Sequence, residues 1–227
     1  MRVLIACEFS GIVREAFAAR GHDAWSCDLL PSERPGQHIQ GDVLEVLGDG
    51  WDLMIAHPPC TYLCSSGLHW NKRRPERDEQ THEAMLFVFA LLGEGNPGNT
   101  IPRIALENPI GRISTAYGPP IQIIHPWQFG HDASKATCLW LKGLPKLKET
   151  KFVPPRYSCS CGTLFPFGLG KYGCPSCHGR GRVRQVWANQ TPSGQNKLGP
   201  SETRWAERSR TYQGFADAMA GQWSASI

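Results

Sequence analysis

The stretch MRVLIACEFSGIVREAFAARG, residues 1–21, predicts a strand, a tight turn and a helix in succession. Residues 3–6 form a short apolar run with β-branched members, which is typical of a buried parallel strand. Residues 12–20 place apolar side chains at helical spacing, and Gly21 suits the carboxyl end of that helix. Residues 8–11 form the turn between the two elements. This order predicts the first unit of an α/β fold.

Further apolar runs continue the alternation along the chain. Strands are predicted at residues 24–27, 51–56, 103–106 and 137–141. Helices are predicted at residues 76–92 and, near the carboxyl end, from 201 or 202 to 222. Strands that alternate with helices predict a Rossmann-like fold with a mostly parallel, doubly wound sheet. Such sheets bind their ligands at the carboxyl ends of the strands.

The composition bounds the class of protein. The chain has 227 residues, of which 41% are hydrophobic, so it can bury a core. Its net charge of +4 is weakly basic and permits a nucleic-acid partner without requiring one. The sequence contains no apolar run of membrane-spanning length and no signal-peptide pattern. We therefore expect a cytoplasmic protein with no membrane partner, present as a monomer or a weak dimer.

Polar side chains follow the predicted strands directly, at Asp28, residues 57–60 and Glu107. The Pro-Pro pair at 58 and 59 removes two N–H donors and stiffens the backbone, which defines the direction of the next side chain. That side chain is Cys60, a strong nucleophile once ionised. A carboxyl group such as Glu107 can hold or protonate a ring nitrogen. The alternatives are a structural cysteine in a tight turn and a capping or salt-bridged glutamate.

The motifs Pro59-Cys60 and Glu107-Asn108 resemble those of the cytosine-5 DNA methyltransferase family. The resemblance covers most of residues 1–142 and implies a Rossmann-like fold that uses S-adenosylmethionine. It implies that Cys60 and Glu107 are catalytic. The resemblance also implies which residues bind the cofactor. They are Phe9, Ser10 and Gly11 in the cofactor turn, the acids Asp28 and Asp42, and Pro58 at the start of the nucleophile motif.

The resemblance also implies a reaction. Attack of the Cys60 thiolate on carbon 6 of cytosine would make carbon 5 enamine-like, while Glu107 interacts with N3 and the exocyclic amine. Carbon 5 would then take the methyl group of S-adenosylmethionine, and loss of the carbon-5 proton would eliminate Cys60. A cytosine inside a duplex must first be flipped out of the stack.

The chain departs from the family pattern in several places. Thr61 follows the cysteine where glutamine is common, and Pro109 follows Asn108 where valine is usual. Residues 135–137 are the sole remnant of the Gln-x-Arg-x-Arg motif, and a large target-recognition domain is missing. These features are similar to those of a compact, divergent, phage-like member that acts in a bacterial or phage-infected cell.

A cysteine cluster near the carboxyl end predicts a small zinc-ribbon-like insert. Cys159-x-Cys161 and Cys174-x-x-Cys177 are separated by twelve residues, and two such pairs can complete a tetrahedral zinc site. The zinc is expected to be structural, because protein groups fill all four positions. His178 replacing one cysteine and a chance cluster of free thiols are the alternatives.

Basic residues suggest double-stranded DNA as the partner. They occur in a loop at residues 69–77, at the remnant motif and after the cysteine cluster, namely Lys72, Arg73, Arg74, Lys135, Arg180, Arg182 and Arg184. Residues 65–67 and the basic positions after them resemble the family's mobile loop that closes on DNA. The alternative is a solvated set of charges.

The predicted organisation is a catalytic core at 1–150, a zinc-binding module at 151–188, and a loop and helix at 189–227 that pack back on the core. The predicted function is methylation of cytosine carbon 5 in DNA. Alternatives are an amino-methyltransferase, a non-catalytic zinc protein that binds nucleic acid on a degenerate methyltransferase fold, and a methylase of free pyrimidine nucleotides.

Overall fold

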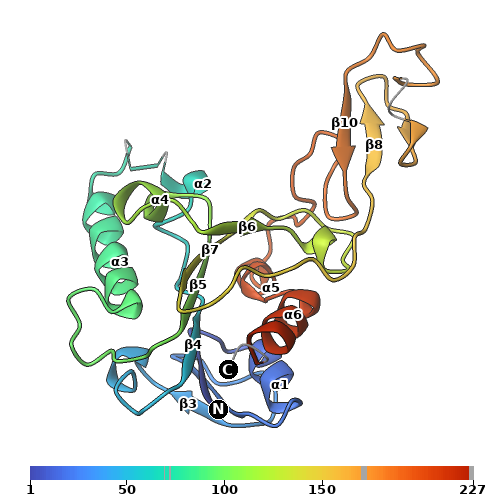
Figure 1. The fold of residues 1–227 in the computed structure, drawn as a ribbon. Helices are drawn as coiled ribbons and strands as arrows, with labels where there is room; N and C mark the ends of the chain where they lie inside the picture. The colour runs from blue at the N-terminus through green and yellow to red at the C-terminus, as the bar shows by residue number, and fades with distance from the viewer. Residues whose placement is uncertain (69, 72, 170–172, 225–227) are drawn as a thin grey trace. The chain divides into compact units, whose positions relative to one another are not determined.

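The computed structural model describes residues 1–68, 70–71, 73–169 and 173–224 (Figure 1). The chain divides into two compact units. The first, here called the sheet unit, comprises Met1–Ile124, Ala136–Lys148 and Phe215–Ile227. The second, here called the cysteine unit, comprises His125–Lys135 and Glu149–Gly214. No helix in the described ranges combines the length and the apolar character that crossing a membrane requires.

Seven strands in the described part of the sheet unit form one sheet, in the order β3-β2-β1-β4-β5-β7-β6. Their bounds are β1 Arg2–Ala6, β2 Asp23–Asp28, β3 His38–Gln40, β4 Leu53–Ala56, β5 Ile104–Pro109, β6 Gln122–Ile124 and β7 Thr137–Lys142. Strands β1 to β5 run parallel, whereas β7 is antiparallel to both β5 and β6. The predicted α/β fold with a mostly parallel sheet is therefore confirmed, and its Rossmann-like order reverses direction between β1 and β4.

Helices cover both faces of this sheet. The helices in the described part of this unit are α1 Ile12–Ala18, α2 Ser65–Leu68, α3 Glu76–Leu92, α4 Arg112–Ala116 and α6 Gln213–Ser224, with a 3-10 turn η1 at Val43–Glu45. Figure 1 shows α3 on one face and α1, with the greater part of α6, on the other. Strands β1 and β4 between these layers are almost wholly buried, which explains their continuous apolar runs.

The single helix predicted from 201 or 202 to 222 is wrong. The structure has two helices there, α5 at Arg204–Ser209 and α6 from Gln213, because Arg210 between them is extended with ψ of 135°. At the start of α6, the Gly214 N–H donates to His131 Nε2 at 2.8 Å. A Cβ on Gly214 would lie 1.9 Å from the Phe129 carbonyl oxygen, so this close approach requires glycine.

Within its described residues, the cysteine unit contains an antiparallel sheet in the order β10-β8-β9. The strands are β8 Arg156–Cys159, β9 Leu164–Phe165 and β10 Val183–Val186. The unit is larger than the predicted module at 151–188 because backbone and side-chain bonds tie flanking segments to it. Thr150 N–H donates to the Gln128 carbonyl at 3.1 Å, and Ser134 N–H donates to Asn189 Oδ1 at 2.9 Å.

Candidate functional site

The carboxyl ends of β1, β2, β4 and β5 lie at one edge of the sheet, because these strands are parallel neighbours. Backbone hydrogen bonds tie the first residues after β1 and β4 to the ends of neighbouring strands. Glu8 N–H donates to the Cys27 carbonyl at 3.2 Å, and His57 N–H donates to the Ala6 carbonyl at 2.9 Å. This edge therefore gathers the predicted cofactor and catalytic residues, which are Phe9, Ser10, Gly11, Asp28, Asp42, Pro58, Cys60 and Glu107. The order of the strands reverses here, which is where open α/β sheets bind ligands.

The segment that carries Cys60 is fastened to the segment that carries Glu107. Residues 57–65 are here called the Cys60 loop, and residues 107–112 the Glu107 segment. The buried Asn108 donates from Nδ2 to the Pro58 carbonyl at 2.8 Å. Farther along, Ser65 N–H donates to the carbonyl of residue 110 at 2.9 Å, and Arg112 N–H donates to that of residue 63 at 2.7 Å. The nucleophile candidate and the carboxyl group are thus held by one connected network.

Gly111 makes this close pairing of the two segments possible. It forms an isolated antiparallel bridge with Cys64. A Cβ at Gly111 would lie 1.9 Å from the Leu63 carbonyl oxygen and 2.8 Å from Cys64 Cα. Any larger residue would therefore push the Cys60 loop away from the Glu107 segment.

His57 is a site residue that the sequence prediction did not assign. Its Nδ1 lies 3.3 Å from Glu107 Oε2, with the two side chains only 8% and 16% exposed. Its Nε2 is buried without a hydrogen-bond partner among the described residues. The ring therefore orients the Glu107 carboxyl group and presents a second polar atom at the same edge. The one signal in the sequence was its position between a core strand and the Pro-Pro pair.

Thiols near this edge differ in their surroundings. Cys60 is half-buried, and its carbonyl accepts hydrogen bonds from the N–H groups of Leu63 and Cys64, which turns the chain directly after it. Cys138 on β7 is buried, and burial together with the Glu107 charge raises its pKa to about 11. Burial, with Asp28 adding to it, also raises the pKa of Cys7. Cys138 and Cys7 therefore remain protonated at neutral pH and are poor nucleophiles.

Glu8 has a structural role that the sequence prediction missed. Its side chain is buried at 4% exposure, and its two carboxylate oxygens accept the N–H groups of Val13 at 2.7 Å and Arg14 at 3.2 Å. Ser10 Oγ also donates to this carboxylate at 3.2 Å. A carboxylate of the protein thus occupies the amino end of α1, the position where a ligand phosphate binds in many nucleotide sites.

The two acids predicted to bind cofactor are at the ends of β2 and β3. Asp28 Oδ1 accepts the Leu30 N–H at 2.9 Å, and partial burial raises the pKa of its carboxyl group. Asp42 is exposed, and its Oδ1 accepts the Leu44 N–H at 2.9 Å as the cap of η1. Burial is the main cause of the raised pKa of the Cys7 thiol in the turn after β1, and the negative charges of both carboxylates add to it.

The loop after β2 is held down by Arg14, which the sequence prediction also missed. Its guanidinium is almost fully buried and donates to Ser26 Oγ at 2.9 Å and Ser32 Oγ at 3.0 Å. It also donates to the carbonyl oxygens of Arg34 and Pro35, at 2.9 Å and 2.8 Å. The charged group is therefore satisfied entirely by neutral oxygens, and it fixes the course of the chain beside Asp28.

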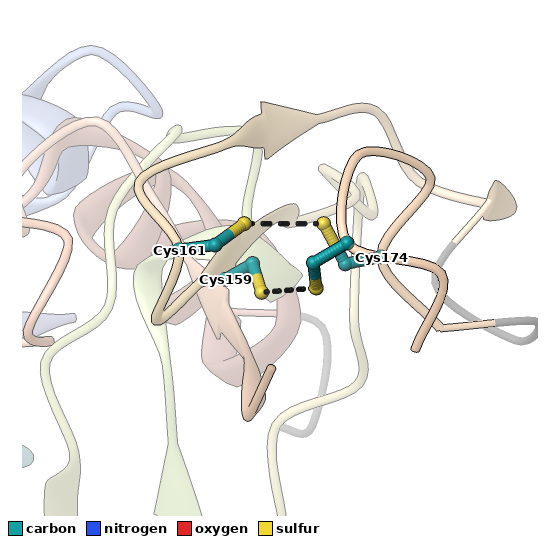
Figure 2. A group of neighbouring side chains, drawn as sticks. Cys159, Cys161 and Cys174 are labelled. Atoms are coloured by element: carbon teal, nitrogen blue, oxygen red, sulfur yellow. Dashed lines mark hydrogen bonds between the residues drawn. The ribbon is translucent and has the colours of Figure 1, made fainter. Parts of the chain in front are cut away.

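The four cysteines of the predicted cluster are brought together in the cysteine unit. The sulfurs of Cys159, Cys161, Cys174 and Cys177 all lie within 4.8 Å of one another. Figure 2 shows the side chains of Cys161 and Cys174 facing each other. Their sulfurs are 3.5 Å apart, and the Cys159 and Cys177 sulfurs are 3.7 Å apart. The Gly181 N–H donates to Cys177 Sγ at 3.1 Å, and a Cβ at Gly181 would lie 2.2 Å from Cys159 Sγ. Four sulfurs so placed can hold a metal ion.

The basic residues predicted to contact DNA are partly engaged within the protein, and Lys72 lies outside the described residues. The guanidinium groups of Arg73 and Arg74 lie over the Trp70 ring, 5.4 and 5.9 Å from its centre. Lys135, Arg180 and Arg184 donate hydrogen bonds to the backbone carbonyl oxygens of Arg208, Cys177 and Ser193, respectively. Arg182 is exposed.

The formal charge of the chain is unevenly divided between the two units. The cysteine unit carries eleven lysine and arginine residues and four acidic residues, a net charge of +7 with neutral histidines. The sheet unit carries thirteen basic and sixteen acidic residues, a net charge of −3. An anionic partner would therefore be attracted mainly to the cysteine unit.

In comparisons with known proteins, the chain matched no protein-family model and no curated protein.

Proposed function

We propose that this chain is an S-adenosylmethionine-dependent methyltransferase that acts on carbon 5 of cytosine in DNA through a covalent adduct with Cys60. The observation that carries the proposal is the network between the Cys60 loop and the Glu107 segment, at the point where the order of the strands reverses.

The turn after β1 supports a cofactor that lacks phosphate groups. In Rossmann dinucleotide sites, the pyrophosphate binds at the amino end of the first helix. Here the Glu8 carboxylate accepts N–H groups at that end, so a phosphate would meet a buried negative charge. S-adenosylmethionine carries no phosphate and is cationic at its sulfur. Asp28 would accept its ribose hydroxyls, and Asp42 would lie near its adenine.

The proposed chemistry assigns one role to each side chain of the network. The Cys60 thiolate forms a bond to carbon 6 of a flipped cytosine, and the displaced electron pair moves into the ring toward carbon 5 and N3. Glu107 stabilises that change by hydrogen bonding to N3 and the exocyclic amine, and His57 holds its carboxyl group in position. S-adenosylmethionine would supply the methyl group to carbon 5 and would leave as S-adenosylhomocysteine. Water would then take the carbon-5 proton, and the electron pair of that C–H bond would reform the ring double bond and expel Cys60 as a thiolate.

We assign zinc to the four-cysteine cluster. A tetrahedral site with zinc–sulfur bonds of about 2.3 Å has sulfur–sulfur separations of about 3.8 Å. The distances of 3.7 Å and 3.5 Å between facing sulfurs are close to that value. The Gly181 N–H bond to Cys177 Sγ is the kind of outer contact that orients a thiolate ligand. Four protein ligands leave no open position, so the ion is structural.

The uneven charge supports DNA as the macromolecular substrate. A net charge of +7 on the cysteine unit favours contact with phosphates, and such contacts release counterions. The affinity for duplex DNA should therefore fall steeply as salt is raised. Arg182→Ala removes an exposed cation and should weaken binding. It should also reduce the slope of log affinity against log salt concentration by about one, the value for one phosphate contact.

Duplex DNA that carries 5-fluorocytosine tests the covalent step. Fluorine cannot leave as a proton does, so the protein should remain attached to the DNA after methyl transfer. We expect a denaturation-resistant complex that depends on S-adenosylmethionine with the wild-type protein, and none with Cys60→Ala. Cys64→Ser is the matched control, because it removes a second half-buried thiol of the same loop. If Cys60→Ala methylates cytosine as fast as the wild type, the covalent mechanism is wrong.

A further inference from the structure

The cysteine unit carries a connected set of aromatic rings, here called the aromatic ladder, composed of Trp127, Phe152, Phe167 and Tyr157. Phe152 meets Trp127 edge-on, with ring centres 5.5 Å apart. Phe167 lies 6.4 Å from Phe152 and is stacked on Tyr157 at 6.3 Å, with the two planes only 15° apart. The ladder joins the segment at 125–135 to the chain around β8 and β9.

The two middle rings of the ladder are exposed, although the unit has its own core. Phe152 and Phe167 are 52% and 54% exposed. The neighbouring Phe165 is 5% exposed and forms the core with Cys159 and Cys174. Half-exposed phenyl rings therefore lie beside, and not within, the apolar interior. Exposed apolar groups that adjoin one another can form an interaction site, unlike exposed apolar residues that are scattered singly.

The charge around the ladder indicates which partner it fits. The unit has a net charge of +7, and the exposed Lys151 directly precedes the ladder residue Phe152 in sequence. The exposed Arg156, which precedes Tyr157, is paired with Asp132 at 3.0 Å. A symmetric contact between the cysteine units of two copies would bring another +7 to this surface and be repelled. Aromatic rings on a cationic background are the combination that binds unpaired nucleic acid, since bases stack on the rings while phosphates meet the cations.

We propose that the aromatic ladder stacks unpaired bases of DNA, with Phe152 and Phe167 as the contacting rings. Taking DNA as the partner rests on the proposed function. Unpaired bases arise wherever an enzyme opens a duplex to extrude a base, and they are present throughout single-stranded DNA. Base–aromatic stacking is independent of base identity, because every base has a π-face. The ladder would therefore add affinity for opened DNA without reading sequence.

The test measures binding of the full-length protein to a fluorescently labelled single-stranded oligothymidine of about twelve nucleotides and to a mixed-sequence duplex. Oligothymidine contains no cytosine, so the proposed catalytic site has no target in it. Phe152→Ala and Phe167→Ala should each weaken oligothymidine binding by roughly five- to 150-fold, the range for loss of one stacked base. Phe167→Trp should retain the affinity. None of these changes alters charge, so the salt slope should stay the same.

Leu164→Ala is the matched control. Leu164 is 56% exposed, but it pairs with Ser158 and therefore lies on the opposite face of the hairpin from Tyr157. Its substitution removes exposed apolar surface and should leave oligothymidine binding unchanged. Metal content and circular dichroism of each variant verify that the unit is folded.

The outcomes separate the two proposals. If both phenylalanine variants bind oligothymidine as tightly as the wild type, the proposal that the aromatic ladder stacks bases is overturned. A wild-type dimer that the same substitutions dissociate would overturn it in favour of a second copy as the occupant. If the 5-fluorocytosine adduct fails to form while the phenylalanine variants lose oligothymidine binding as expected, the methyl-transfer proposal fails and base stacking stands.

Discussion

Gly111→Ala is the sharpest single change for testing whether the pairing of the two site segments matters. The substitution adds one methyl group where the Glu107 segment passes the Cys60 loop. That methyl carbon would lie 1.9 Å from the Leu63 carbonyl oxygen and 2.8 Å from Cys64 Cα. Both obstacles are backbone atoms, so no side-chain rotation can relieve the clash.

The size of the effect follows from these distances. Non-bonded heavy atoms settle at roughly 3.5 Å, so the Cys60 loop must retreat by more than about 1 Å. Overpacking of this kind destabilises a protein by about 1–3 kcal/mol. The retreat also strains the bonds from Arg112 N–H and Ser65 N–H that tie the segments together. A displacement of about 1 Å at reacting groups costs on the order of 100-fold in rate.

Two measurements follow from this reasoning. Urea unfolding monitored by circular dichroism should show a lower midpoint for Gly111→Ala, and trapping on 5-fluorocytosine DNA should slow by about 100-fold. Gly199→Ala is the control, since a Cβ there meets nothing within 4 Å in the described structure. Unchanged stability and trapping would refute the close pairing. Lower stability with an unchanged trapping rate would refute its catalytic importance.

Four further predictions concern the surrounding structure. Glu8→Ala leaves two N–H groups of α1 without their acceptor, so urea unfolding should show a loss of about 1–3 kcal/mol. Asn108→Asp places a buried carboxylate against the Pro58 carbonyl and should destabilise the protein more than Asn108→Ala; equal losses in urea would contradict this account. Elemental analysis should find one zinc per chain, and chelation should release it and expose the four cluster thiols; metal-free protein with freely titratable thiols would exclude the site. Burial raises the pKa of Cys27 from 9.0 to about 11, so the thiol ionises at a lower pH in the unfolded chain than in the folded one. The free energy of unfolding should therefore fall as the pH rises from 9.0 toward about 11. Urea unfolding midpoints measured across this range should fall less for Cys27→Ala than for the wild type.

Elements with a strong local pattern could be predicted from the chain alone. The helix predicted at residues 76–92 coincides with α3, and the apolar run at 3–6 lies within β1. Their signals are complete within a short window, because helical spacing and continuous apolar runs depend on near neighbours. The spacing of the four cysteines likewise indicated the cluster, since close pairs in a chain can meet only through tight turns. The three-residue strands β3 and β6 carry too little pattern for such a prediction.

The functional arrangement depended on contacts between distant parts of the chain. His57 and Glu107 are fifty residues apart, and no local pattern relates them until parallel β4 and β5 bring their carboxyl ends side by side. Gly111 is one glycine among many in the sequence, and only the opposing backbone of the Cys60 loop shows why a side chain cannot fit there. Local periodicity thus sets which strands and helices form. The identity of the residues that share a site is decided by packing, because hydrogen bonds and steric contacts act through space and not along the chain.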